Sequence, residues 1–153
     1  MREILFRGKR LDNGEWIQGF LVIWGNDYYI APDINAYTSM GGRGKGRCMM
    51  FGHYYQVLPE TVGQYTGLTD KNGKKIFEGD ILEGIRYGNE ERAEVLWIDK
   101  AASWGIRYSF REKNESGYTS WLNSAWFRSI NDARAPVVIG NIHDNPELLE
   151  VAE

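Results

Sequence analysis

The segment best suited to chemistry is residues 41–47, Gly-Gly-Arg-Gly-Lys-Gly-Arg, where four glycines alternate with three cations. Backbone N–H groups in such a loop, together with Arg43, Lys45 and Arg47, can cradle phosphate groups. The loop is not a nucleotide-binding fingerprint, because Gly46 stands where the Walker A motif requires Ser or Thr. A solvated, flexible linker has the same composition. Arg43, Lys45 and Arg47 are therefore the candidate nucleic-acid-binding residues, and a plain linker is the alternative.

Aromatic side chains are abundant, at 14% of the chain with six tryptophans. Single-stranded nucleic acid stacks on exposed rings beside cationic grooves. A β-rich core needs large rings as well, and we expect core packing for most of them. The rings considered as stacking platforms are Tyr28, Tyr29, Tyr54, Tyr55, Trp104 and Tyr108.

Nucleophilic catalysis would have to use Cys48, the single cysteine, with His53 or His143. If residues 48–53 form one strand, the odd separation of five residues places Cys48 and His53 on opposite faces. They would then form no direct dyad. Cys48 fits better as a small buried hydrophobe. We identify no catalytic residues.

A metal site is suggested only by the carboxylates near residue 70. Asp70 and Asn72 match the first and third positions of a calcium loop. Lys75 then replaces the required glycine, and Ile81 replaces the terminal glutamate. We therefore predict no metal and no cofactor.

The elements that would position these residues are mostly hairpins. Asn-Gly steps at residues 13–14 and 72–73 lie between strand-like runs, which is a strong hairpin signal. The run at residues 16–23, with Trp24 after it, is apolar on both alternating faces. That pattern indicates burial from two sides or an oligomer interface.

The second half of the chain contains five short strand-like runs separated by polar turns. They lie at residues 81–87, 93–99, 105–110, 118–122 and 136–142. This spacing predicts a small barrel or sandwich, and we prefer an SH3-like β-barrel. Asn145 and Pro146 predict a short helical turn near the C-terminus. A second helical turn is considered for residues 123–127.

The predicted architecture is all-β. A hairpin-rich N-terminal region covers residues 1–78 and includes a flexible loop at 32–47, and the SH3-like barrel covers 79–153. One compact unit is the alternative. The net charge of −3 gives no overall attraction to nucleic acid. No segment reaches the roughly 20 apolar residues of a membrane span, so we expect a cytoplasmic protein without membrane contact.

Three segments carry a family resemblance. Residues 59–81, PETVGQYTGLTDKNGKKIFEGDI, resemble the central signature of the YopX family, and residues 2–8 and 140–149 resemble its two ends. The resemblance implies an all-β protein encoded by phages or prophages, able to oligomerise. It implies no established activity and no catalytic residues. Within the signature, Gly, Asn and Asp are also the residues that tight turns require.

The functional prediction is an accessory protein of a phage or prophage, in the bacterial cytoplasm, that acts by assembly or protein contact rather than by catalysis. We expect a homo-oligomer, with a host or phage protein as a further partner. The alternative is a nucleic-acid-binding module that uses the basic glycine loop at 41–47 and exposed aromatics. An enzyme is the third hypothesis, and no residue pattern points to one.

Overall fold

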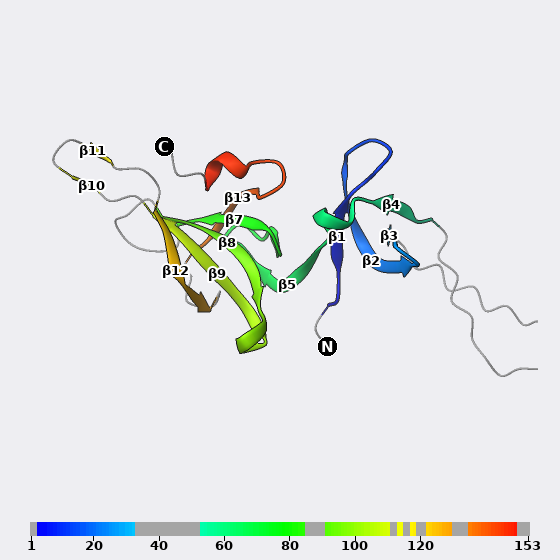
Figure 1. Cartoon of the computed structure of the whole chain (residues 1–153), viewed down its shortest axis with the longest axis horizontal. Helices are drawn as coiled ribbons and strands as arrows, with labels where there is room; N and C mark the ends of the chain where they lie inside the picture. The colour runs from blue at the N-terminus through cyan, green and yellow to red at the C-terminus, as the bar shows by residue number, and fades with distance from the viewer. Residues whose placement is uncertain are drawn as a thin grey trace, which may run out of the picture. The chain divides into compact units, whose positions relative to one another are not determined.

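The structure is a computed structural model that describes residues 3–32, 53–84, 91–110, 113–114, 117–118, 122–129 and 135–149. It divides into two compact units, Met1–Tyr65 and Thr66–Glu153, and each is described by itself (Figure 1). The sequence suggested a domain boundary between residues 78 and 79. That boundary remains a prediction.

The first unit is an antiparallel sheet in the order β4-β3-β2-β1-β5. Its elements are β1 (Phe6–Lys9), β2 (Trp16–Trp24), β3 (Asp27–Ala31), β4 (Tyr55–Val57), the 3-10 turn η1 (Pro59–Thr61) and the start of β5 (Gly63–Thr69). β1 and β2 form the hairpin predicted at residues 13–14. Gly14 has φ +73°, a conformation that glycine adopts without steric cost.

β4 has partners on both of its edges. On one side it pairs with β3, from Tyr28 opposite Val57 to Ile30 opposite Tyr55. On the other side the Leu11 N–H donates to the Gln56 carbonyl at 2.9 Å, and the N–H of Leu58 donates to the Lys9 carbonyl at 2.9 Å. The short strand is therefore fixed between the end of β1 and β3.

The interior of the first unit is small and depends on glycine. Ile30, Ala31 and Val57 are buried there. A Cβ atom on Gly8 would lie 3.0 Å from the Val57 side chain, so the missing side chain lets β1 and β4 approach closely. At Gly19, a Cβ atom would overlap the backbone of Ala31.

The second unit is built on a five-stranded antiparallel sheet in the order β12-β9-β8-β7-β13. Its strands are β7 (Asp80–Glu83), β8 (Glu91–Ile98), β9 (Ser103–Phe110), β12 (Leu122–Ser129) and β13 (Val137–Asn141), with β6 (Lys75–Phe77) paired to β5 and β10 (Lys113–Asn114) paired to β11 (Gly117–Tyr118). A barrel would require the two edge strands to pair with each other. The described strands of the second unit do not close a barrel, so the all-β prediction is confirmed and the SH3-like barrel is not.

Two sequence expectations about local structure have different outcomes. Residues 123–127 belong to strand β12, so the helical turn considered there is wrong. Of the strand predicted at 118–122, the two ends lie in β11 and β12, and residues 119–121 lie outside the described residues. The register between β12 and β9 shifts between Asn123 and Phe127, which breaks the alternation that identifies a strand. The C-terminal turn is confirmed as the 3-10 helix η4 (Pro146–Leu148). No helix in the described ranges is long and apolar enough to cross a membrane.

The core of the second unit lies along the inner face of β7, β8 and β9. Its buried members are Ile76, Leu82, Ala93, Val95, Trp104, Ile106 and Val138. Trp104 also pairs across strands with Trp97, at 5.1 Å between ring centroids and an interplanar angle of 76°. This edge-to-face arrangement is favourable for aromatic rings. It explains why tryptophans are used in the β8–β9 hairpin.

Candidate functional site

The most prominent surface feature of the first unit is a row of large apolar side chains across β2, β3 and the residue before β4. We call it the aromatic face, and it consists of Phe20, Val22, Trp24, Tyr29 and Tyr54. Side chains at alternate positions of β2 point to one side of the sheet, and Val22 lies opposite Tyr29 in the register. The Tyr29 and Tyr54 rings meet edge to face at 5.5 Å.

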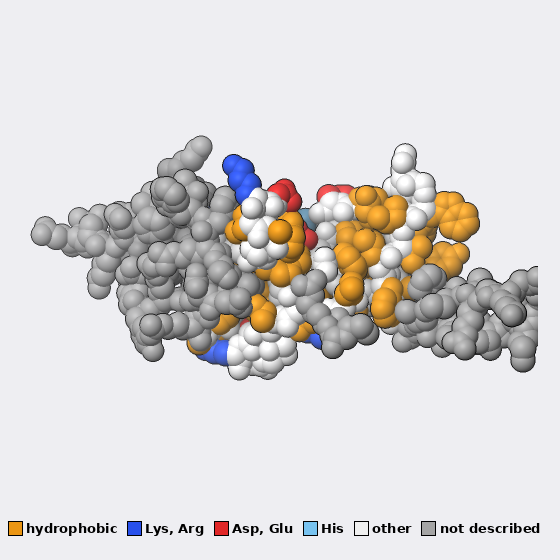
Figure 2. All heavy atoms as spheres, turned by 90° about the horizontal axis from the view of Figure 1, so that it is seen from below, with side chains coloured by type: hydrophobic (Ala, Val, Ile, Leu, Met, Phe, Trp, Pro, Cys, Tyr) orange, Lys and Arg blue, Asp and Glu red, His pale blue; other side chains and the backbone are white. Residues whose placement is uncertain are grey.

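The aromatic face is open to solvent. Trp24 is 80% exposed, Tyr54 63% and Phe20 39%. Figure 2 shows hydrophobic side chains gathered side by side on the surface of this unit. The largest contiguous apolar patch on a soluble protein is often a binding surface. The aromatic face is therefore the strongest candidate for a functional surface among the described residues.

The other side of the β2–β3 hairpin is apolar near its end as well. Ile23 is 56% exposed there, and it lies opposite the half-buried Tyr28. The sequence offered two interpretations of the two-faced strand, burial from both sides or an interface. The described part of the chain covers neither side at the hairpin end, so the described residues do not bury this strand from both sides.

Charge is scarce on the aromatic face. Among the described side chains that β2, β3, Tyr54 and β4 place on this side, Asp27 is the only charged one. It accepts a hydrogen bond from the Gln56 amide at 3.2 Å. A surface of this kind is suited to apolar contact rather than to charge pairing.

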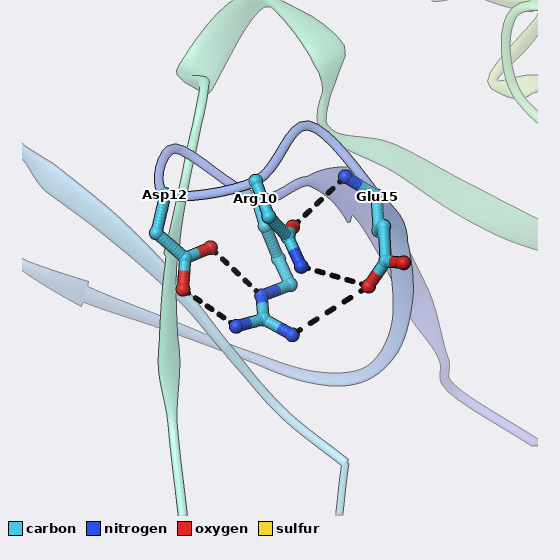
Figure 3. A network of polar contacts seen from close by, with 4 residues as sticks. Arg10, Asp12 and Glu15 are labelled. Atoms are coloured by element: carbon cyan, nitrogen blue, oxygen red, sulfur yellow. Dashed lines mark hydrogen bonds and ion pairs between the residues drawn. The ribbon is translucent and has the colours of Figure 1, made fainter.

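A polar network next to β4 has a different role (Figure 3). The Arg10 guanidinium donates through Nε to Asp12 Oδ1 at 2.9 Å and through Nη2 to Asp12 Oδ2 at 2.5 Å. It lies 3.9 Å from Glu15 and 4.1 Å over the ring of Tyr55. The hydrogen bond between the two groups raises the pKa of Arg10 and lowers the pKa of Asp12. The network therefore fixes the β1–β2 turn against β4.

The Asp70 carboxylate, considered above as a calcium ligand, binds backbone N–H groups instead. Oδ1 accepts from Asn72 at 2.8 Å and from Lys74 at 2.9 Å, and Oδ2 accepts from Val138 at 3.2 Å. Burial acts to raise the pKa of Asp70, but the hydrogen bonds from Lys74, Val138 and Asn72 outweigh it and lower the pKa. Asp70 thus connects the 70–74 turn to β13. No cluster of His, Cys, Asp or Glu with metal-binding geometry occurs among the described residues.

The predicted site residues have separate outcomes. Arg43, Lys45 and Arg47, with the rest of the predicted loop after Pro32, lie outside the described residues, and so does Cys48. Their assignment to nucleic-acid binding stays a prediction. His53 is exposed in the first unit, whereas His143 is half-buried in the second.

The suggested stacking rings divide by burial. Trp104 is buried, in agreement with core packing, and Tyr28, Tyr29 and Tyr55 are half-buried. Tyr54 is exposed, and the side chain of Tyr108 is outside the described part.

Sequence reasoning missed two members of the aromatic face, Phe20 and Trp24, as exposed rings. A usable signal was present at Trp24, since Gly25 follows it directly with φ +61° in the β2–β3 turn. A large ring at a hairpin end has few neighbours to cover it.

Comparison with known proteins supports the family resemblance. The family model described as YopX protein matches residues 6–150. The solved structure of protein EF1440 from Enterococcus faecalis is 25% identical, with 98% of this chain and 100% of that chain covered and a TM-score of 0.48. No curated protein matches the chain.

Proposed function

The chain belongs to the YopX family, and from this premise we propose that it is a phage or prophage accessory protein that acts by self-assembly rather than by catalysis. The exposed aromatic face is the observation that carries the proposal. Its expected place of action is the bacterial cytoplasm. A host or phage protein would be a further partner of the assembled form.

The size of the aromatic face sets a condition on the assembly. Large aromatic side chains bury roughly 150–250 Å² each. When these areas are scaled by the exposed fraction of each side chain, the apolar surface available per copy is about 400 Å². It comes from Trp24, Tyr54 and Phe20 with their half-buried neighbours. Two such faces would bury about 800 Å², below the roughly 1,000 Å² of a specific interface. The contact must therefore extend to Ile23, so the partner encloses the hairpin end from both sides.

A second copy is the occupant that fits best. With Asp27 as the one described charge on it, the aromatic face provides no charge pattern to select a charged partner. An apolar surface is buried most favourably against another apolar surface. Every additional copy of the chain provides such a surface. Twofold contacts that use the same patch on both subunits are the most common form of assembly.

The test is the molar mass in solution, measured by light scattering over a range of protein concentrations. We expect a discrete oligomer for the natural chain and a shift toward monomer for Trp24→Gln. Ile4→Gln is the matched control, because Ile4 is 58% exposed but precedes β1, outside the strands that carry the aromatic face. A monomeric natural chain, or an oligomer that Trp24→Gln leaves intact, would contradict self-assembly through this face.

Nucleic-acid binding is the second candidate, and the exposed rings of Trp24 and Tyr54 favour it. Each exposed ring can stack a base, and the predicted cations Arg43, Lys45 and Arg47 would contact phosphates. The same light-scattering measurement is repeated with mixed short single-stranded and duplex DNA at low and moderate salt. A salt-sensitive increase in mass that is lost when the three cations are changed to alanine would rank this function first.

A further inference from the structure

The chain contains two Asn-Gly steps, Asn13-Gly14 and Asn72-Gly73. In such a step the backbone nitrogen of glycine can attack the side-chain carbonyl carbon of asparagine, because glycine has no side chain to hinder the approach. Both steps lie in exposed turns. Their comparison indicates which of them is chemically protected.

The glycine N–H group makes a similar backbone hydrogen bond in both Asn-Gly steps. The Gly14 N–H donates to the Arg10 carbonyl at 3.0 Å, and the Gly73 N–H donates to the Asp70 carbonyl at 3.0 Å. Both glycines have positive φ, +73° and +81°. Any difference in reactivity must therefore come from the asparagine side chains.

The two side-chain amides differ clearly. Asn13 is held at both atoms, since Oδ1 accepts from the Glu15 N–H at 3.0 Å and Nδ2 donates to Glu15 Oε2 at 2.7 Å. The Asn72 side chain is exposed and has no hydrogen bond to any described residue. Only its backbone N–H is engaged, by Asp70. The Asn72 amide is free to rotate into the position for attack, whereas the Asn13 amide is not.

We propose that Asn72 is the preferred site of spontaneous deamidation in this chain. The Gly73 nitrogen forms a bond to Cγ of Asn72 and gives its proton to a solvent base, and the Cγ–Nδ2 bond breaks to release ammonia. Water then opens the succinimide at either carbonyl and leaves aspartate or isoaspartate. Water is the sole co-reactant.

Deamidation of Asn72 weakens the 70–74 turn in which this residue lies. The new carboxylate lies two residues from the buried Asp70 carboxylate, which accepts the N–H groups of residues 72 and 74. Two negative charges at this separation repel each other. Isoaspartate also adds a methylene to the main chain between these two donors, so they no longer fit Oδ1 together. The same Asp70 holds the Val138 N–H of β13, so the modification loosens the link between the turn and that strand.

The experiment incubates the whole natural chain in mildly alkaline buffer and follows both steps by peptide mapping with mass spectrometry. We expect conversion at Asn72 to be several-fold faster than at Asn13. Glu15→Ala removes the carboxylate that holds Asn13 Nδ2 and should bring the Asn13 rate closer to the Asn72 rate. Equal or faster conversion at Asn13 in the natural chain would overturn the proposal. So would an Asn72 that stays intact while a free peptide of residues 69–76 converts completely.

The structural consequence is tested separately with Asn72→Asp, which contains the product charge from the start. Hydrogen exchange at the Val138 amide should be several-fold faster in Asn72→Asp than in Asn72→Gln, which keeps a neutral amide. Equal exchange in the two variants would refute the coupling to β13. The inference does not depend on the proposed function, since no step of it uses the aromatic face.

Discussion

Gly19→Ala is expected to disrupt the first unit, because Gly19 lies where β2 passes against the end of β3. A Cβ atom at this position would be 2.1 Å from the carbonyl oxygen of Ala31, 2.5 Å from its carbonyl carbon and 2.8 Å from Cα of Pro32. All three are backbone atoms, so no side-chain rotation can relieve the overlap. Non-bonded heavy atoms prefer about 3.5–4.0 Å. The two strands must therefore separate by about 1 Å or more.

The expected loss is large on the scale of a small protein. Overpacking a well-packed site costs about 1–3 kcal/mol, and a clash with rigid backbone falls at the upper end or beyond it. We expect a loss of about 3 kcal/mol or more in the free energy of unfolding, out of a typical total of about 5–15 kcal/mol. β2 and β3 also position Phe20 and Tyr29, so the aromatic face should be lost together with the stability.

Gly14→Ala is the matched control for this prediction. Gly14 has φ +73° and nothing within 4 Å of its Cβ position, so alanine there meets backbone strain but no clash. Strain of that kind costs about 1–2 kcal/mol. The assay is urea unfolding of both variants and the natural chain, followed by circular dichroism. A Gly19→Ala variant as stable as Gly14→Ala, or more stable, would refute the packing argument.

Three further outcomes are expected. The pKa of Asp70 is lower in the folded chain than in the unfolded one, so its contribution to stability is present above its ordinary pKa and is lost as pH falls through the folded value. Asp70→Asn should therefore be less stable at neutral pH and lose less stability on acidification, as measured by urea unfolding over a pH series. Ile76→Ala should lose about 2–5 kcal/mol, because Ile76 is 1% exposed in the core, whereas Leu11→Ala should stay within about 0.5 kcal/mol in the same assay. Arg10→Lys keeps the charge but loses the two-point contact with Asp12, so hydrogen exchange at the Leu11 amide should be faster.

Local signals in the sequence were sufficient for the hairpins. The Asn-Gly steps at residues 13–14 and 72–73 both form turns between antiparallel strands, because the need for positive φ is a property of the turn residues themselves. The terminal turn at Pro146 was predictable for a similar reason.

Long-range pairing was not predictable in the same way. Whether β12 pairs with β13 to close a barrel depends on strand contacts that leave no local pattern, and the SH3-like barrel was expected from strand spacing alone. β12 itself was missed because its register shift places Asn123 to Phe127 out of alternation. The sequence identified apolar faces on β2, but exposure at Trp24 depends on which elements reach the hairpin end.

The occupied edges of β4 determine how association through the first unit would end. An open strand edge accepts further strands without limit, since each added strand presents a new edge, and this is how fibres grow. β4 is hydrogen-bonded to β3 on one side and to the Lys9 and Leu11 backbone on the other. Contact at the neighbouring aromatic face must therefore use side chains. Once these side chains are covered, they offer no further exposed surface to another copy. When two copies meet through the same patch in a twofold contact, such association saturates at a finite size and does not propagate.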